Sequence, residues 1–159
     1  MAQHKDVEEP GLQFVYSIDF QVGNVIISPG EPQGTRVLIP IISGGIFQGG
    51  EGFEDFKGTF ESPSSDWATM YEDGSGLQLK VNFVFKTEEG GVVLGYVEGR
   101  SERLQQNKNG VGSSSEAKIH SSISFETGVE KYKWMNKKVF MGKGRKDGDR
   151  VKINYYQIL

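Results

Sequence analysis

The chain has 159 residues, with 18 Lys and Arg against 21 Asp and Glu, so its net charge is −3 at pH 7. It has no cysteine and only two histidines, His4 and His120, which excludes a disulfide framework, a thiol nucleophile and a His-rich zinc site. The length predicts one domain around a single core, and no apolar run approaches the roughly 20 residues of a membrane span. We therefore expect one cytoplasmic domain without a membrane segment.

Residues 1–11, MAQHKDVEEPG, are polar and acidic, which predicts a flexible amino-terminal tail and not a signal peptide. From residue 12 onward, apolar and polar residues alternate with the period of a half-buried strand. Such segments lie at 12–20, 37–41, 56–60, 67–71, 77–85, 92–100, 119–125, 139–143 and 151–158. One short helix is expected near 127–136, where Thr127 and Glu130 have the spacing of a capping box.

The number of strands predicts an all-β fold. Antiparallel strands this numerous usually remove their free edges by closing, so we expect a single antiparallel barrel of about eight to ten strands over residues 12–159. A sandwich is the alternative, and a strand edge left open would allow a homo-oligomer. A barrel of this size has room for one small ligand. Residues 101–116, SERLQQNKNGVGSSSE, lack periodicity and predict a mobile loop, either a lid or a disordered excursion.

A turn at Glu88-Glu89 sets the register of one predicted hairpin. It pairs Phe85 with Val92 and, further along, places Glu98 and Arg100 opposite leucines. Because directly paired residues share a sheet face, this register puts Glu98 and Arg100 on the apolar side, as a candidate site. The alternative is an ordinary surface salt bridge between the two, which would contribute little to stability.

A turn at Asp147-Gly148 predicts a second hairpin, with Gly142 opposite Ile153 and Gly144 opposite Val151. Glycine then stands on the core face where a large side chain is expected. Either an interior cavity is kept open there, or a neighbouring aromatic side chain fills the space.

Several common motifs are absent or weak. The glycine pairs of SGGIFQGGEG match no phosphate-binding loop, and His120 is predicted to face solvent together with Ser122 and Ser124. Nine of the 18 basic residues lie within 131–152, which we interpret as a solvated outer face and not as a nucleic-acid site. Acid–base chemistry would then fall to a carboxylate, with Asp66, Glu98, Asp73 and Glu126 as candidates.

A set of short motifs, taken in order, resembles one known family. They are RVLIPIISGGIFQG (36–49), Asp66-Trp67, Thr87 with Gly90, Gly99-Arg100, FETG (125–128), YKWMN (132–136) and FMGKG (140–144). Over residues 12–158 the chain resembles the domain of unknown function 3237 family. The resemblance implies a lipocalin-like antiparallel barrel. Fungal relatives look like small cofactor-free enzymes of secondary metabolism, including a chalcone-isomerase-like cyclase that closes a ring by adding a phenol to an enone.

The leading functional hypothesis is therefore a cofactor-independent isomerase or cyclase of secondary metabolism that acts on an aromatic or polyketide-like molecule. Such chemistry needs a shaped cavity, a base and a donor for the developing enolate oxygen, with no metal and no cofactor. We expect Arg100 and Arg36 to stabilise the oxyanion and Asp66 or Glu98 to be the base. The expected substrate contacts are Trp67, Phe83, Tyr96, Tyr132, Trp134, Asn136 and Phe140.

These residues also have structural interpretations. The side chains of Trp67, Tyr132 and Trp134 could plug the barrel ends. Asp66 could cap a turn, Arg36 could pair with an outer carboxylate, and Asn136 could bond to backbone at the helix end. For the whole protein, the alternatives are a non-catalytic carrier of a small molecule and a partner-binding protein whose cavity is filled.

Overall fold

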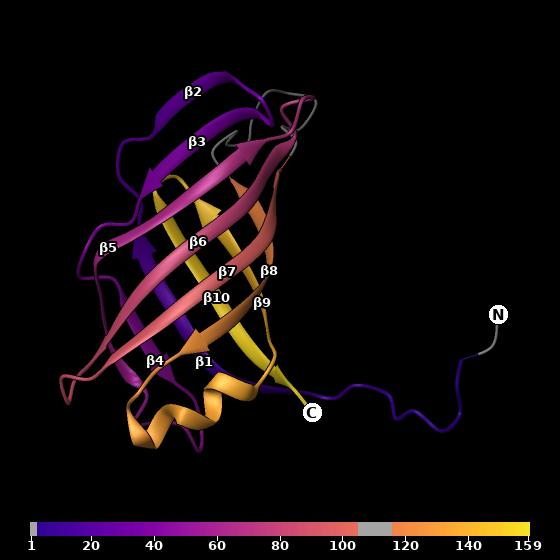
Figure 1. Ribbon diagram of the computed structural model, residues 1–159, viewed down its shortest axis with the longest axis vertical. Coiled ribbons are helices and arrows are strands. Elements are labelled where there is room, and N and C mark those ends of the chain that lie inside the picture. Colours follow the sequence, from indigo (N-terminus) through magenta and orange to yellow (C-terminus); the bar gives the residue numbers. More distant parts are fainter. Residues whose placement is uncertain (1–2, 105–115) are drawn as a thin grey trace.

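The computed structural model describes residues 3–104 and 116–159, and within these residues ten strands and one short helix account for the regular structure (Figure 1). The elements are β1 (Leu12–Gln21), β2 (Ile26–Glu31), β3 (Gly34–Pro40), β4 (Ile46–Gly49), β5 (Lys57–Met70), β6 (Gly76–Thr87), β7 (Val92–Arg103), β8 (Ala117–Glu126), η1 (Glu130–Lys137), β9 (Phe140–Asp147) and β10 (Arg150–Ile158).

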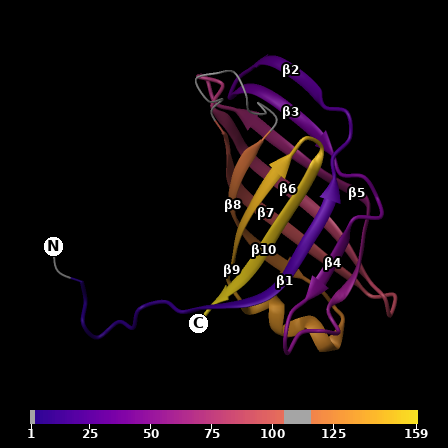
Figure 2. The same ribbon diagram turned by 180° about the vertical axis from the view of Figure 1, so that it is seen from behind.

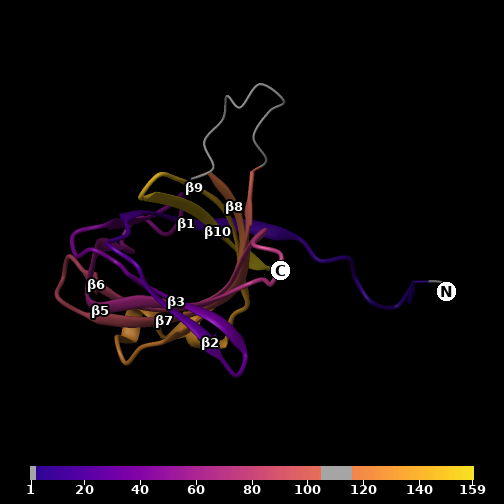
Figure 3. The same ribbon diagram turned by 90° about the horizontal axis from the view of Figure 1, so that it is seen from above.

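The strands form one antiparallel sheet that closes on itself. Its order is β2-β3-β5-β4-β1-β10-β9-β8-β7-β6, and β6 also pairs with β5, so the eight strands β1 and β4–β10 make a closed barrel among the described residues (Figures 1 and 2). Seen from above, these strands form a ring (Figure 3). The predicted all-β barrel is confirmed. Two predicted segments, 56–60 and 67–71, merge into β5, which pairs first with β4 and then with β3.

The helix η1 lies below one end of the barrel (Figure 1). A short helix near 127–136 is confirmed, although it is a 3-10 helix that begins at Glu130. The predicted capping box is wrong, because the residue before the helix is Val129 and no side chain caps the first turn. Thr127 instead donates its hydroxyl to the Val92 carbonyl and accepts the amide of Val129.

The predicted register of the β6–β7 hairpin is wrong by one residue. Phe85 pairs with Val93, because the turn has a three-residue loop, 88–90, that ends in a glycine with φ +90°. A slip of one residue turns every side chain of a strand to the other face. Glu98 and Arg100 therefore point out of the barrel, and the inward residues of β7 are Val93, Gly95, Val97, Gly99 and Ser101.

The β9–β10 hairpin differs from the prediction by two residues. Its loop is Gly148-Asp149, so Gly142 lies opposite Tyr155 and Gly144 opposite Ile153. A slip of two preserves the face, and both glycines lie on the inner side as expected. The space at Gly142 is filled, since a Cβ there would lie 2.5 Å from Cε1 of Tyr155. At Gly142 the aromatic-filling interpretation, not the cavity, is therefore the correct one, whereas at Gly144 the space is taken by the side chain of Ile153 and the backbone carbonyl of Lys152.

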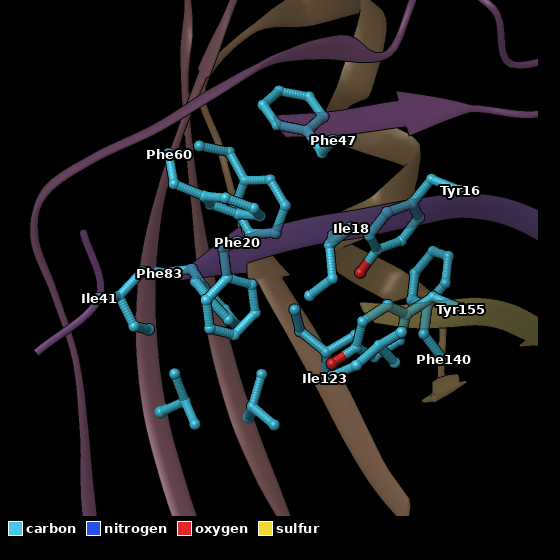
Figure 4. Close-up of a cluster of buried hydrophobic side chains, with 14 of the residues drawn as sticks. Tyr16, Ile18, Phe20, Ile41, Phe47, Phe60, Phe83, Ile123, Phe140 and Tyr155 are labelled. Carbon is cyan, nitrogen blue, oxygen red and sulfur yellow. The ribbon is translucent and has the colours of Figure 1, made fainter. Parts of the chain in front are cut away.

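The half of the barrel near the helix is packed with aromatic side chains (Figure 4). A bulge in β1 between Phe14 and Tyr16 buries both Val15 and Tyr16 and leaves Leu12 and Phe14 exposed, so the predicted apolar face of this strand begins at Tyr16. The rings that meet in this plug are Tyr16, Phe47, Phe56, Phe60, Phe85, Phe125, Phe140 and Tyr155.

Two predicted segments lie at the edges of the described chain. Residues 3–11 contain no strand or helix and are exposed, and Figure 3 shows them leaving the barrel. The predicted loop over 101–116 overlaps β7, which continues to Arg103, and the Leu104 amide still donates to the Glu116 carbonyl. The rest of that loop, 105–115, lies outside the described residues.

Candidate active site in the barrel cavity

The half of the barrel away from η1 contains a cavity of about 780 Å³. Its wall is mostly aliphatic, with Val37, Ile39, Leu79, Val81, Ile119 and Val151 among the lining residues. The cavity exists because the inward positions at this level carry smaller, often branched side chains, whereas those of the other half carry large rings. Its volume lies in the range of small-molecule sites.

Asp66 is a buried ionisable group on this wall. It lies on β5 between the inward-facing Ser64 and Ala68, and only 7 % of its surface is exposed. Burial raises the pKa of its carboxyl group from 3.8 to about 6, and the Lys80 amide, which donates to Oδ1 at 2.9 Å, partly opposes that rise. The group is therefore a stronger base than an ordinary aspartate.

The contact with Lys80 also alters the barrel wall. In the pairing of β5 with β6, Asp66 pairs with Val81, and the next pair along β5 is Thr69 with Gln78. Two residues of β5 between these pairs have no partner on β6. Here the side chain of Asp66 accepts the hydrogen bond from the Lys80 amide, which in a regular sheet would go to a backbone carbonyl. The carboxyl group is thus held by the sheet and does not cap a turn.

Two hydroxyl groups face the same cavity from other strands. The Oγ of Ser121 and the phenol oxygen of Tyr155 lie 3.2 Å apart, and burial raises the pKa of Tyr155 to about 12, so the phenol stays protonated. Tyr155 stacks on Tyr16, with ring centres 4.9 Å apart, and Figure 4 shows both hydroxyl oxygens on the same side of the pair. The hydroxyl of Tyr16 is buried without a hydrogen-bond partner in the described part of the chain.

The mouth of the cavity combines apolar and charged side chains. Val25, Ile27 and Ile42 line it and are about half exposed, at 47 %, 56 % and 46 %. Arg103, Glu116, Lys146 and Asp149 add two charges of each sign. A mostly apolar molecule with a few polar groups fits such a lining.

Of the residues predicted from sequence, Asp66 and Phe83 line the cavity. Glu98 and Arg100 do not, because the one-residue register slip places them on the outer face. The guanidinium of Arg100 donates to the carbonyl of Gly99 at 2.9 Å, and within the described residues Glu98 and Arg100 form no ion pair with each other.

Arg36 and Trp67 also lie on the outer face. Arg36 donates to the hydroxyl of Thr69 at 2.9 Å, and not to a carboxylate, and the indole of Trp67 is 54 % exposed. Arg36, Trp67 and Glu98 line one shallow groove of about 250 Å³ on the outside of the barrel. The structure thus brings three of the predicted residues together, but on the other side of the wall from Asp66.

The remaining predicted substrate contacts lie away from the cavity. Tyr96 is on the outer face and donates its hydroxyl to Glu126, and Tyr132 is buried beneath the plug, where its hydroxyl donates to the Asp55 carbonyl. Asn136 bonds to both backbone groups of Thr127. Trp134 and Phe140 pack against each other at the closed end, with ring centres 6.1 Å apart.

Sequence reasoning missed Ser121, Tyr155 and the mouth residues. The alternation of β8 places Ser121 on the same face as Ile119 and Ile123, and this pattern was the available signal for an inward hydroxyl. Among the described residues, no helix is long and apolar enough to cross a membrane. In the same part of the chain, no three His, Asp or Glu side chains gather as metal ligands.

Together these features define an antiparallel β-barrel protein with one aromatic-filled half and one half open as a cavity of small-molecule size. Residues 10–158 match the model of the family described as "Protein of unknown function (DUF3237)", and the chain belongs to this family.

Relatives from bacteria share most of the chain. A UPF0311 protein from Bradyrhizobium diazoefficiens is 28% identical over 154 residues, covering 92% of this chain and 95% of its own. A solved structure of a protein of unknown function from Rhodopseudomonas palustris has a TM-score of 0.80 at 24% identity, and the match covers 96% of this chain and 100% of that chain.

An enzyme from Penicillium herquei also has a similar structure. Its TM-score is 0.69 at 19% identity, and the match covers 99% of this chain and 100% of that chain. These structures are similar in fold.

Proposed function

We propose that the protein is a cofactor-independent isomerase or cyclase that acts on an aromatic or polyketide-like small molecule inside the barrel. The observation that carries the proposal is Asp66, a buried carboxyl group with a pKa raised to about 6 on the wall of a cavity of about 780 Å³. A base whose pKa lies near the working pH serves general acid–base catalysis well. The Penicillium herquei neighbour, described as an enzyme, supports the barrel as a scaffold for catalysis.

The reaction we propose is the intramolecular addition of a phenol to an enone. The carboxylate of Asp66 takes the phenolic proton, the phenolate oxygen forms a bond to the enone β-carbon, and the displaced π electrons move onto the carbonyl oxygen as an enolate. The protonated carboxyl group then returns its proton to the enolate α-carbon. Substrate and product have the same atoms and electrons, so the step balances as an isomerisation.

The hydroxyl groups of Tyr155 and Ser121 are the proposed donors to the enolate oxygen. They replace Arg100 and Arg36 in that role, because both arginines lie outside the barrel. A protonated phenol in a largely apolar cavity can donate a hydrogen bond to a developing negative charge, and no water molecules have to be displaced from the phenol first. Phe83, on the cavity wall, would pack against the substrate.

The test compares Asp66→Asn with the wild type on a panel of hydroxychalcones. The substitution keeps the shape of the side chain and an oxygen for the Lys80 amide, but removes the base. We expect kcat to fall by about 10²- to 10⁴-fold with little change in KM. Glu126→Gln is the matched control, because Glu126 is on the outer face and should leave turnover unchanged.

Two results would refute the proposal. If D66N turned over the substrate as fast as the wild type, Asp66 would not be the base. If the wild type accelerated no cyclisation over buffer, the reaction assignment would fail for this substrate class.

A second candidate function is a carrier that binds a small molecule without changing it. The aliphatic wall favours this function, since it offers burial to any apolar ligand. A carrier should lose affinity in Phe83→Ala and should release its ligand with an unchanged mass. The cavity argues against the third alternative, a partner-binding protein with a filled barrel, because its volume exceeds the roughly 300 Å³ that a small-molecule site needs.

Two further expectations concern the whole protein. Cell fractionation would test the expected cytoplasmic location, and light scattering would test the expected homo-oligomer.

A further inference from the structure

We propose that the outer groove around Trp67 binds a pyranose sugar, at a site separate from the barrel cavity. The groove has a volume of about 250 Å³ and lies where β3, β5, β6 and β7 run side by side on the outer face. Its lining residues are Gln33, Arg36, Trp67, Thr69, Gln78, Leu79, Lys80 and Glu98. The proposal goes beyond the proposed cyclase activity and does not depend on it.

The hollow has a physical origin in the strand pairing. The β5–β6 pairs lapse between Asp66 and Thr69, because the Lys80 amide bonds to the Asp66 side chain instead of a backbone carbonyl. The groove lies at this interruption, and Leu79, which is 9 % exposed, lines both the groove and the inner cavity. The groove therefore lies over an interruption in the pairing of β5 with β6, and outward-facing side chains form its rim.

The side chains at the rim form two neighbouring rows on this face. In one row, Arg36 pairs in register with Thr69, which pairs with Gln78. In the other row lie Trp67 of β5 and the directly paired Lys80 and Glu98 of β6 and β7. The hydrogen bond from Arg36 to Thr69 holds the guanidinium in the first of these rows.

This set of groups matches the chemistry of a pyranose. A sugar ring offers an apolar C–H face, for which an indole that is 54 % exposed is a suitable partner, and a rim of hydroxyls that both donate and accept. Glutamine amides, a carboxylate, a guanidinium and an ammonium supply both acceptors and donors. The side chains of Gln33, Gln78, Lys80 and Glu98 make no hydrogen bond or ion pair to the rest of the described chain, so these groups can turn toward a ligand.

Other ligand classes fit the groove less well. An apolar ligand would leave the many polar groups of the groove without hydrogen-bond partners. A single carboxylate is too few for a divalent cation. With Arg36 and Lys80 against Glu98 the groove carries one net positive charge, so a sugar acid should bind more tightly than its neutral counterpart.

Trp67 supplies the reporter for the test. The chain has two tryptophans, so the Trp134→Phe variant leaves the indole of Trp67 as the sole source of tryptophan fluorescence. We would titrate this variant with methyl gluco-, galacto- and mannopyranoside and with methyl glucuronide, and use glycerol as a polyol that lacks a ring face. We expect a saturable change in fluorescence with a Kd in the millimolar range for at least one sugar, as its small number of atoms implies, and none for glycerol.

Ligand-observed NMR on the wild type and on two variants completes the test and does not require Trp134→Phe to fold. Trp67→Ala should weaken sugar binding at least about tenfold. Tyr96→Ala, which removes an exposed aromatic ring outside the groove, should leave it unchanged. The proposal is overturned if no sugar saturates the protein below about 100 mM, or if W67A binds as the wild type does.

Discussion

The environment of Asp66 predicts an unusual dependence of stability on pH. A rise of its pKa from 3.8 in the unfolded chain to about 6 in the barrel means that the folded state holds this proton more tightly. The contribution of this group to stability is therefore greatest below pH 4, declines as the pH rises from 4 to 6, and reaches its least favourable value above 6. At about 1.4 kcal/mol for each unit of pKa, the decline amounts to roughly 3 kcal/mol.

Asp66→Asn should abolish that decline. Asparagine is close to the protonated carboxyl group in shape, is never charged, and can still accept the Lys80 amide bond. We expect the free energies of unfolding of the two proteins to be similar below pH 4 and the variant to be more stable by roughly 3 kcal/mol above pH 6.

Urea denaturation at a series of pH values from 3.5 to about 8 measures the difference, and the m-value checks that both proteins unfold in the same way. Taking the difference between the two proteins removes the contributions of the other carboxylates. Glu126→Gln, on the outer face, serves as the control for removing a carboxylate that does not line the cavity. Parallel curves for D66N and the wild type would refute the claim that burial in the cavity raises the pKa of Asp66.

Two further substitutions test the packing. Tyr16→Phe removes a buried hydroxyl that lacks a partner in the described residues and should raise the free energy of unfolding by about 1 kcal/mol, whereas Tyr155→Phe breaks the bond to Ser121 and should lower it by a similar amount. If both changed stability in the same direction, the assignment of the hydroxyl partners would be wrong. Gly142→Ala should cost about 1–3 kcal/mol, because its Cβ would lie 2.5 Å from Tyr155 and 2.8 Å from Ser121. Gly128→Ala, with no atom within 4 Å of its Cβ, is the control, and equal melting temperatures for the two alanine variants would contradict the close approach at Gly142.

The two hairpins show what could be predicted from the sequence. Both turns were located within a residue or two, but the face of a strand depends only on whether the error is odd or even. The even slip at Gly148-Asp149 left Gly142 and Gly144 on the inner side. The odd slip at 88–90 turned β7 over, and with it the candidates Glu98 and Arg100. A loop of two residues and a loop of three that ends in glycine are difficult to tell apart from EEGG alone.

The candidate site was predicted in part for a related reason. Asp66 was among the candidate carboxylates, but the alternation along this strand predicts that the large apolar Trp67, and not Asp66, faces the interior. The rule that large apolar side chains face the interior fails around a cavity, because small or polar side chains can line it. Ser121 and Tyr155 were missed because an inward serine cannot be told from an outward one until the strand register is known.

The division of the barrel into a filled and an open half has a consequence for the evolution of such a protein. Most of the large buried rings lie in the filled half, so substitutions around the cavity remove few of the contacts on which folding depends. Effects at well-separated sites tend to add independently. Descendants of this chain could therefore acquire new pocket shapes, and new small molecules to bind, while the aromatic half keeps the fold intact.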